Sequence, residues 1–258
     1  MIAPGKFIVG TSGYSFEDWV GPFYPPGTKD RSMFDHYARN FQTTELNFTF
    51  YSMPFPRTLE SLARRSSEGF SFWLKAHGDI THKHNLSICD EFIEDLSPLR
   101  IHNKLAGVLL QFPQSFRRTI ENRKFLASAI DAMKTVPLAV EFRHKTWDVP
   151  ESYQGLRDRD VACVVPDEPD LPELYHPRPL ATNATAYLRL HSRDAAKWYG
   201  SDKERYDYDY SEQELRDVLT DWSNQPFAVD RVYTFFNNCH AGHAAANAMA
   251  FKKILEGI

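Results

Sequence analysis

The stretch Leu138-Ala-Val-Glu-Phe-Arg-His-Lys-Thr-Trp147 decides the fold that we expect of this 258-residue chain. Side chains alternate across a strand, so Glu141 and Arg143 share one face while Val140 and Phe142 share the other. An apolar strand that ends in a carboxylate and a guanidinium is typical of a parallel barrel, in which the strand tips form the site. The alternative interpretation is a structural ion pair between Glu141 and Arg143 at a strand end.

Seven further segments have the composition of strands, and they alternate with segments of helical periodicity. The expected strands are residues 6–10, 43–51, 70–77, 105–112, 161–165, 186–191 and 231–237, and the expected helices include 31–40, 57–66, 91–100, 119–134, 151–157, 211–222 and 241–255. Parallel strands need crossover connections, and eight β/α units close into a barrel. We therefore predict a single α/β domain over residues 1–258, a (β/α)8 TIM-type barrel with outer helices. An open doubly wound sheet is the alternative, but no Gly-x-Gly-x-x-Gly follows the first strand.

Composition excludes several classes of protein. Apolar residues make up 42% and charged residues 25% of the chain, an ordinary globular balance. The net charge of −4 gives no overall basic field for nucleic acid or an anionic membrane. No apolar run approaches the roughly 20 residues of a membrane span, and we find no signal peptide. Three widely spaced cysteines favour reduced thiols, so we expect a cytoplasmic protein without a membrane partner.

Polar residues recur at the C-terminal ends of the expected strands, and in a barrel these ends surround one mouth. The candidate acids, bases and proton shuttles are Glu45, Glu141, His77 and His191. Lys75, Arg143 and Arg189 bring three cations to the same mouth, which favours a phosphate or carboxylate ligand. The candidate ligand contacts are Thr11, Tyr14, Asn47, Tyr51, Lys75, His82, Gln111, Arg143, His144, Trp147, Arg189 and Asn237.

A metal at this mouth is a weaker hypothesis. Glu45 and Glu141 with a histidine would supply ligands, but the cations around these carboxylates oppose a further divalent ion. His82 with His84 is a second candidate pair, but no matching carboxylate lies nearby in the sequence. We therefore predict no metal and no cofactor, and expect purified protein to carry no stoichiometric divalent ion. Covalent nucleophilic catalysis has no support, because neither a Gly-x-Ser-x-Gly motif nor a Cys–His pattern is present.

Motifs along nearly the whole chain resemble the YecE-like family, domain of unknown function 72. They are Gly10-Thr-Ser-Gly-Tyr14 with Trp19, Phe23-Tyr-Pro25, Glu45-Leu-Asn-Phe-Thr-Phe-Tyr51, Ile80-Thr-His82, Gln111-Phe-Pro113, Val140-Glu-Phe-Arg-His144 with Trp147, Arg189-Leu-His191, and Phe236-Asn-Asn238 with Gly242-His243. The resemblance implies a TIM-type barrel, similar in fold to metal-dependent sugar isomerases and apurinic-site endonucleases, but it implies no activity. The sequence departs from the family pattern at Phe48, Ser52 and Cys239.

Three functions remain open. The first is an enzyme that acts on a small phosphorylated or carboxylated compound by acid–base chemistry. The second is a non-catalytic binding protein for an anionic metabolite or a nucleic-acid end, and the third is a metal-dependent hydrolase or isomerase. A perturbed carboxylate beside a void would favour catalysis, whereas glutamates held in ion pairs would favour binding. Nucleic acid is not favoured, since the only basic or aromatic rim candidates are His82, Lys83, His84, Arg193, Lys197 and Trp198.

Two expectations concern mobile or solvated parts of the site. Residues 193–210 would form either a lid or a solvated loop. Separately, no sequence feature indicates an oligomeric state. We expect Arg143 to face water and to wait for the anion, so Arg143→Ala would change stability by only about 1 kcal/mol or less.

Overall fold

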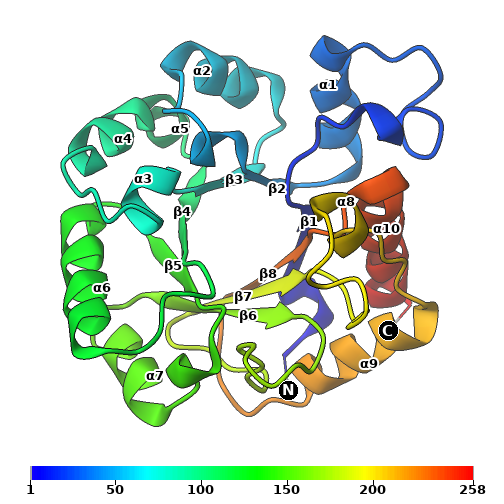
Figure 1. Ribbon diagram of the computed structural model, residues 1–258. Helices are drawn as coiled ribbons and strands as arrows, with labels where there is room; N and C mark the ends of the chain where they lie inside the picture. The colour runs from blue at the N-terminus through cyan, green and yellow to red at the C-terminus, as the bar shows by residue number, and fades with distance from the viewer. Residues whose placement is uncertain (1, 258) are drawn as a thin grey trace.

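The computed structural model describes residues 2–257 and contains eight parallel strands in a nearly closed barrel (Figure 1). The strands are β1 (Phe7–Thr11), β2 (Thr43–Leu46), β3 (Ser71–Lys75), β4 (Leu105–Gln111), β5 (Leu138–Glu141), β6 (Ala162–Asp167), β7 (Thr185–Leu190) and β8 (Arg231–Phe236). Each strand pairs with its sequence neighbours from β2 to β8, and β8 pairs with β1. The predicted TIM-type barrel is confirmed.

Helices surround the strands in Figure 1. They are α1 (Asp30–Asn40), α2 (Pro56–Arg65), α3 (Gly78–Thr81), α4 (Cys89–Asp95), α5 (Ser97–Ile101), α6 (Ile120–Met133), α7 (Pro150–Arg157), α8 (Asp202–Arg205), α9 (Glu212–Ser223) and α10 (His243–Glu256). Short 3-10 turns are η1 (Pro4–Lys6), η2 (Glu17–Trp19), η3 (Phe48–Phe50), η4 (Lys145–Trp147) and η5 (His240–Gly242). An irregular segment rich in proline connects β6 to β7, because proline cannot donate the helical hydrogen bond.

The seam between β1 and β2 closes the barrel by an unusual route. Gly10 allows the two backbones to approach, since a Cβ at this position would lie 2.4 Å from the Thr43 carbonyl oxygen. The Tyr37 hydroxyl of α1 accepts a hydrogen bond from Thr11 N (2.9 Å) and donates one to Thr43 O (3.0 Å). A side chain from the helix layer thus replaces a strand-to-strand hydrogen bond at the seam.

The interior below the mouth is filled with aromatic rings. Trp73, Tyr187 and Tyr233 pack edge to face, with ring centroids 4.8 Å and 5.5 Å from that of Trp73. The Trp73 ring lies against Gly107, where a Cβ would come within 2.5 Å of the indole. The interior is therefore a packed core rather than a channel, and it forms the floor of the site above it.

The structure differs from the expected elements in two places. The strand expected over residues 43–51 ends at Leu46, because the Thr49 hydroxyl donates to Leu46 O (3.1 Å) and Lys75 O (2.6 Å) and holds a 3-10 turn. The helix expected over 91–100 is divided into α4 and α5, since Pro98 starts a new helix more readily than it continues one.

Two further findings concern residues 2–257. Every helix within residues 2–257 is too short or too polar to cross a bilayer. Cys89, Cys163 and Cys239 are free thiols, in agreement with the expected absence of a disulfide framework.

Candidate functional site

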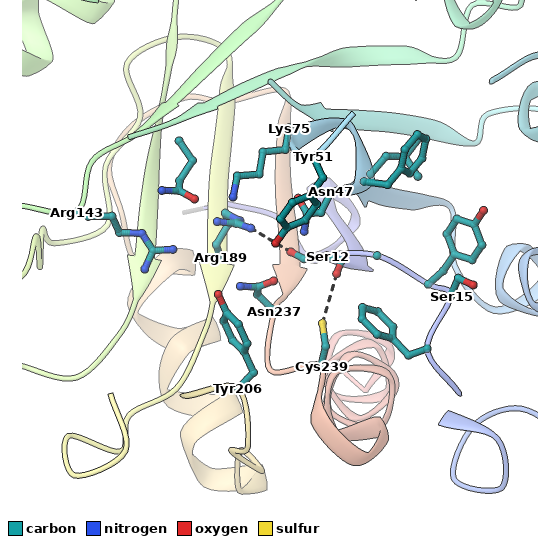
Figure 2. A pocket seen from close by; sticks show the side chains of 16 residues that line it. Ser12, Ser15, Asn47, Tyr51, Lys75, Arg143, Arg189, Tyr206, Asn237 and Cys239 are labelled. Atoms are coloured by element: carbon teal, nitrogen blue, oxygen red, sulfur yellow. Dashed lines mark hydrogen bonds between the residues drawn. The ribbon is translucent and has the colours of Figure 1, made fainter. Parts of the chain in front are cut away.

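A cavity of about 400 Å³ opens at the C-terminal ends of the strands (Figure 2). Figure 2 shows Lys75, Arg189 and Asn237 directed toward this space from different strands. Eight of the predicted site residues line it: Tyr14, Asn47, Tyr51, Lys75, Gln111, Arg143, Arg189 and Asn237. Period-two alternation directs six of them to the mouth, because Asn47, Lys75, Gln111, Arg143, Arg189 and Asn237 each follow an interior-facing strand residue by two positions. Tyr14 and Tyr51 come from the segments that follow β1 and η3.

Beneath the cavity, Arg189 joins the two predicted catalytic carboxylates. Its Nη2 donates to Glu45 Oε1 (2.6 Å) and its Nη1 donates to Glu141 Oε2 (2.5 Å). The Tyr187 hydroxyl donates to the other Glu45 oxygen at 2.6 Å. Glu45 and Glu141 are fully buried and Arg189 is 2% exposed. The three charges form a desolvated unit that is stable because each charge is paired.

Arg143 extends this unit toward β6. Its Nε lies 2.5 Å from Glu141 Oε1 in an ion pair without hydrogen-bond alignment, and its Nη1 donates to Glu168 Oε2 at 2.9 Å. Its Nη2 lies 3.1 Å from His191 Nε2, which must accept, since a guanidinium only donates. The expectation that Arg143 waits in water for an anion is therefore wrong, because its guanidinium is already paired with two buried carboxylates, those of Glu141 and Glu168. Its side chain nevertheless forms part of the cavity wall.

Burial and charge move the pKa values of these groups in different directions. Burial alone would raise the pKa of Glu141, but the cations of Arg143 and Arg189 hold that pKa well below its ordinary range. Burial raises the pKa of Glu168 to about 8 against the opposing charge of Arg143. Burial, helped by Arg143, lowers the pKa of His191 to about 3, so its ring is neutral at pH 7.

Lys75 is the exception among the cations of the site. Its ammonium lies 4.1 Å from the centroid of the Phe50 ring, and within residues 2–257 it makes neither a hydrogen bond nor an ion pair. Burial, followed by the nearby charge of Arg189, lowers the pKa of Lys75 to about 8. The Asn47 Oδ1 atom, also at the cavity, is buried and has no hydrogen-bond donor among the described residues.

Five predicted site residues have structural contacts elsewhere. Thr11 binds Tyr37 at the barrel seam, and His77 Nδ1 accepts from Asp79 N (3.1 Å) to cap α3. His82 is exposed and contacts Thr81 and Phe50. None of these three lines the cavity.

His144 and Trp147 belong to the turn after β5. His144 Nδ1 accepts from Thr146 N (3.2 Å), and its Nε2 lies 3.0 Å from Glu173. Trp147 is buried, donates to Phe116 O (2.6 Å) and stacks on Phe142. Both residues shape the core rather than the mouth, so the sequence motif that contains them combines site and scaffold.

Sequence reasoning missed part of the cavity wall and one buried acid. The missed wall residues are Ser12, Gly13, Ser15, Phe16, Leu46, Phe48, Tyr206 and Cys239. Glu168 lies beyond the strand expected over residues 161–165, although the alternation Ala162, Val164, Pro166, Glu168 continues the interior face of β6 and is a usable signal. Tyr206 had no such signal, because it reaches the cavity from the irregular 193–210 segment.

Comparison with known proteins supports one family. A family model described as "Protein of unknown function DUF72" matches residues 8–257. The UPF0759 protein YunF of Bacillus subtilis is 30% identical over 268 residues, covering 96% of this chain and 94% of that protein. The crystal structure of a DUF72 family protein from Thermotoga maritima has a TM-score of 0.90 at 38% identity and covers 97% of this chain and 99% of its own. A DUF72 family protein from Enterococcus faecalis reaches a TM-score of 0.86 at 27% identity, covering 97% and 95%.

Proposed function

The chain belongs to the DUF72 family, and we propose that its barrel mouth binds a small anion that also carries hydroxyl groups, such as a sugar phosphate or a hydroxy acid. The observation that carries the proposal is the Lys75 ammonium, which faces a cavity of about 400 Å³ without an ion pair among residues 2–257. Burying an unpaired charge costs free energy, and an anion that binds beside the Lys75 ammonium would reduce this cost.

The charge balance identifies Lys75 as the group that attracts the ligand. Arg143 and Arg189 carry two positive charges, and Glu45 and Glu141 carry two negative charges within the same set of ion pairs. With a pKa of about 8, Glu168 is largely protonated at pH 7 and adds little. The charge of Lys75 is then left over, enough for one phosphate or carboxylate group.

The second feature of the ligand follows from Asn47. Its buried Oδ1 accepts no hydrogen bond in the described chain, and such an atom costs free energy until a donor reaches it. A carboxylate or a fully ionised phosphate has no proton to offer, so a hydroxyl or amine on the same ligand would supply the donor. Tyr14, Phe16 and Phe48 line the cavity and provide apolar surface for the carbon skeleton.

Binding is favoured over turnover because both predicted catalytic carboxylates, Glu45 and Glu141, are held by arginine. The same ion pairs argue against a metal at these carboxylates. Acid–base turnover is a second candidate, favoured by one observation: the pKa of Lys75, lowered to about 8 first by burial, suits proton transfer near neutral pH. A nucleic-acid end fits less well, since Lys83, Arg193 and Lys197 at the rim already pair with Asp79, Asp167 and Asp207.

The test is calorimetric titration of wild type and two lysine variants with inorganic phosphate, ribose 5-phosphate and glycerate. We expect Lys75→Met to lose at least tenfold in affinity for a ligand that wild type binds, because a charge-assisted hydrogen bond is worth about 1.5–3 kcal/mol. Lys83→Met is the matched control and should bind as wild type does, since Lys83 is 74% exposed and pairs with Asp79. Equal affinity of Lys75→Met and wild type, or no binding of any probe by wild type, would overturn the proposal.

A further inference from the structure

Three potential metal ligands converge beside the mouth, outside the group of charges described above. Asp207 lies in the segment between α8 and α9, His240 lies in η5, and His243 is the first residue of α10; Figure 1 shows α8 next to α10. The Asp207 Oδ1 atom is 3.2 Å from His240 Nδ1 and 3.4 Å from His243 Nε2. We propose that these three side chains bind a divalent transition metal ion of the zinc class.

The 3.4 Å separation of His243 Nε2 from Asp207 Oδ1 matches a metal site and carries no hydrogen bond, whereas the 3.2 Å contact from His240 Nδ1 is compatible with a metal site and also with a hydrogen bond. Zinc binds imidazole nitrogen and carboxylate oxygen at about 2.0–2.2 Å, so two ligand atoms in a tetrahedral site lie about 3.3–3.5 Å apart. Hydrogen bonds between nitrogen and oxygen are usually about 2.9–3.0 Å long. Both distances to Asp207 Oδ1 are longer than that, and all three donor atoms lie within 4.8 Å of one another.

The backbone between the histidines has a conformation that costs energy without such a role. Ala241 has φ 53° and Gly242 has φ 84°, so two consecutive residues occupy the left-handed region between His240 and His243. For alanine this conformation is strained, and strained backbone of this kind concentrates at functional sites. The Ala241 amide donates to Asp18 Oδ2 at 2.7 Å, which fixes the turn.

The neighbours of the cluster have both favourable and unfavourable effects on a metal. Asp209 adds negative charge near the cluster: its Oδ1 lies 3.8 Å from His243 Nδ1, beyond hydrogen-bond distance, and accepts a hydrogen bond from Asn247 Nδ2 (2.8 Å). Lys197 Nζ donates a hydrogen bond to the other oxygen of Asp207, Oδ2 (3.2 Å), so Oδ1 is the oxygen that faces the two histidines. The Lys197 charge itself repels a cation, and its removal should tighten the site.

The donor set indicates the kind of metal and its coordination. Two imidazoles and one carboxylate suit zinc, cobalt, nickel or ferrous iron, whereas calcium and magnesium prefer oxygen ligands alone. Three protein ligands leave at least one position for water, as in exchangeable rather than closed structural sites. Tyr206 and Cys239, which precede Asp207 and His240, line the cavity, so the metal would lie at the rim of the mouth.

This inference revises the expectation that purified protein carries no divalent ion. That expectation considered only the carboxylates crowded by cations in the barrel, Glu45 and Glu141, together with His82 and His84. His240 and His243 are three residues apart, but Asp207 precedes them by more than 30 residues, so its proximity to them had no sequence signal. The proposal does not depend on the anion site, because none of its three ligands lines the cavity.

The test uses chelator-treated full-length protein, titrated with Zn²⁺ by calorimetry and with Co²⁺ by visible absorption. We expect one ion per chain, an intense tetrahedral Co²⁺ spectrum, and at least a tenfold loss of affinity in Asp207→Asn and His243→Ala. If circular dichroism shows that Asp207→Asn or His243→Ala has not folded, His240→Ala is used in place of that variant. Lys197→Met should bind Zn²⁺ more tightly than wild type, a result that a merely structural cluster would not produce.

The matched control is His176→Ala, because His176 is an exposed histidine on the β6–β7 connection, and it should bind Zn²⁺ as wild type does. Absence of Zn²⁺ and Co²⁺ binding in wild type at millimolar metal would overturn the proposal. Equal affinities of wild type, Asp207→Asn and His243→Ala would also overturn it, because the ions would then bind elsewhere.

Discussion

Replacing Arg143 by alanine should destabilise the protein by about 3 kcal/mol, because the guanidinium pairs with two buried carboxylates. Glu141 keeps its contact with Arg189 at 2.5 Å in the variant, whereas Glu168 loses the 2.9 Å hydrogen bond from Arg143. Removing one partner of a buried ion pair costs about 3–5 kcal/mol. Near pH 6 we expect a cost of about 3 kcal/mol, the lower end of this range. Burial raises the pKa of Glu168 to about 8, so at pH 6 the unpaired Glu168 carboxyl keeps its proton and carries no charge.

The cost should increase with pH. At pH 9 Glu168 is ionised in wild type and paired with Arg143, but in the variant it must either remain unpaired or hold a proton against the solution pH. The measurement is urea denaturation at pH 6 and pH 9, followed by circular dichroism. For a chain of this size, a loss of 3 kcal/mol corresponds to a decrease in Tm of about 6–12 °C.

Arg216→Ala is the matched control. Arg216 is 51% exposed and pairs with Glu212 at 2.6 Å on α9, so its loss should cost about 0.5 kcal/mol or less. If Arg143→Ala also stayed within 1 kcal/mol of wild type at both pH values, the ion pairs would contribute nothing. Arg143 would then be a solvated group that waits for a ligand.

Three further predictions follow from the same structure. Wild type should lose stability as pH rises, because folding raises the pKa of Glu168 from 4.5 to about 8, and the stability that this shift provides is complete below about pH 4.5 and lost by about pH 8. Glu168→Gln should abolish this loss. Parallel slopes of unfolding free energy against pH in the two proteins would contradict the prediction. Phosphate-monoester affinity should fall as pH rises through about 8, where Lys75 loses its charge, and calorimetry from pH 7 to 9.5 should show no such fall in Lys75→Met. Gly107→Ala should destabilise the protein by at least about 1–3 kcal/mol, since the new Cβ would lie 2.5 Å from the Trp73 ring. Gly155→Ala on α7 is the control: its Cβ meets nothing within 4 Å, so it should stabilise the protein by about 0.4–1 kcal/mol. Thermal melts in which both variants match wild type would refute the packing argument.

The barrel and the side chains on its strand tips were predictable because local rules decide them. Period-two alternation assigns Glu141, Arg143 and Arg189 to one face, and parallel strands bring their C-terminal ends together. The alternation of strand and helix then predicts the architecture. For the same reason the sequence predicts Lys75 and Gln111 at the mouth, and both line the cavity.

Only the tertiary structure decided which of these groups are paired and which are available. Arg143 and Lys75 have the same sign and a similar position at a strand tip, yet the first contacts two carboxylates and the second contacts none among residues 2–257. The difference depends on Glu168, which directly follows β6 and reaches Arg143 but not Lys75. Electrostatic energies in a desolvated site depend on the distances between charges from different segments, and sequence spacing along one strand contains no information about those distances.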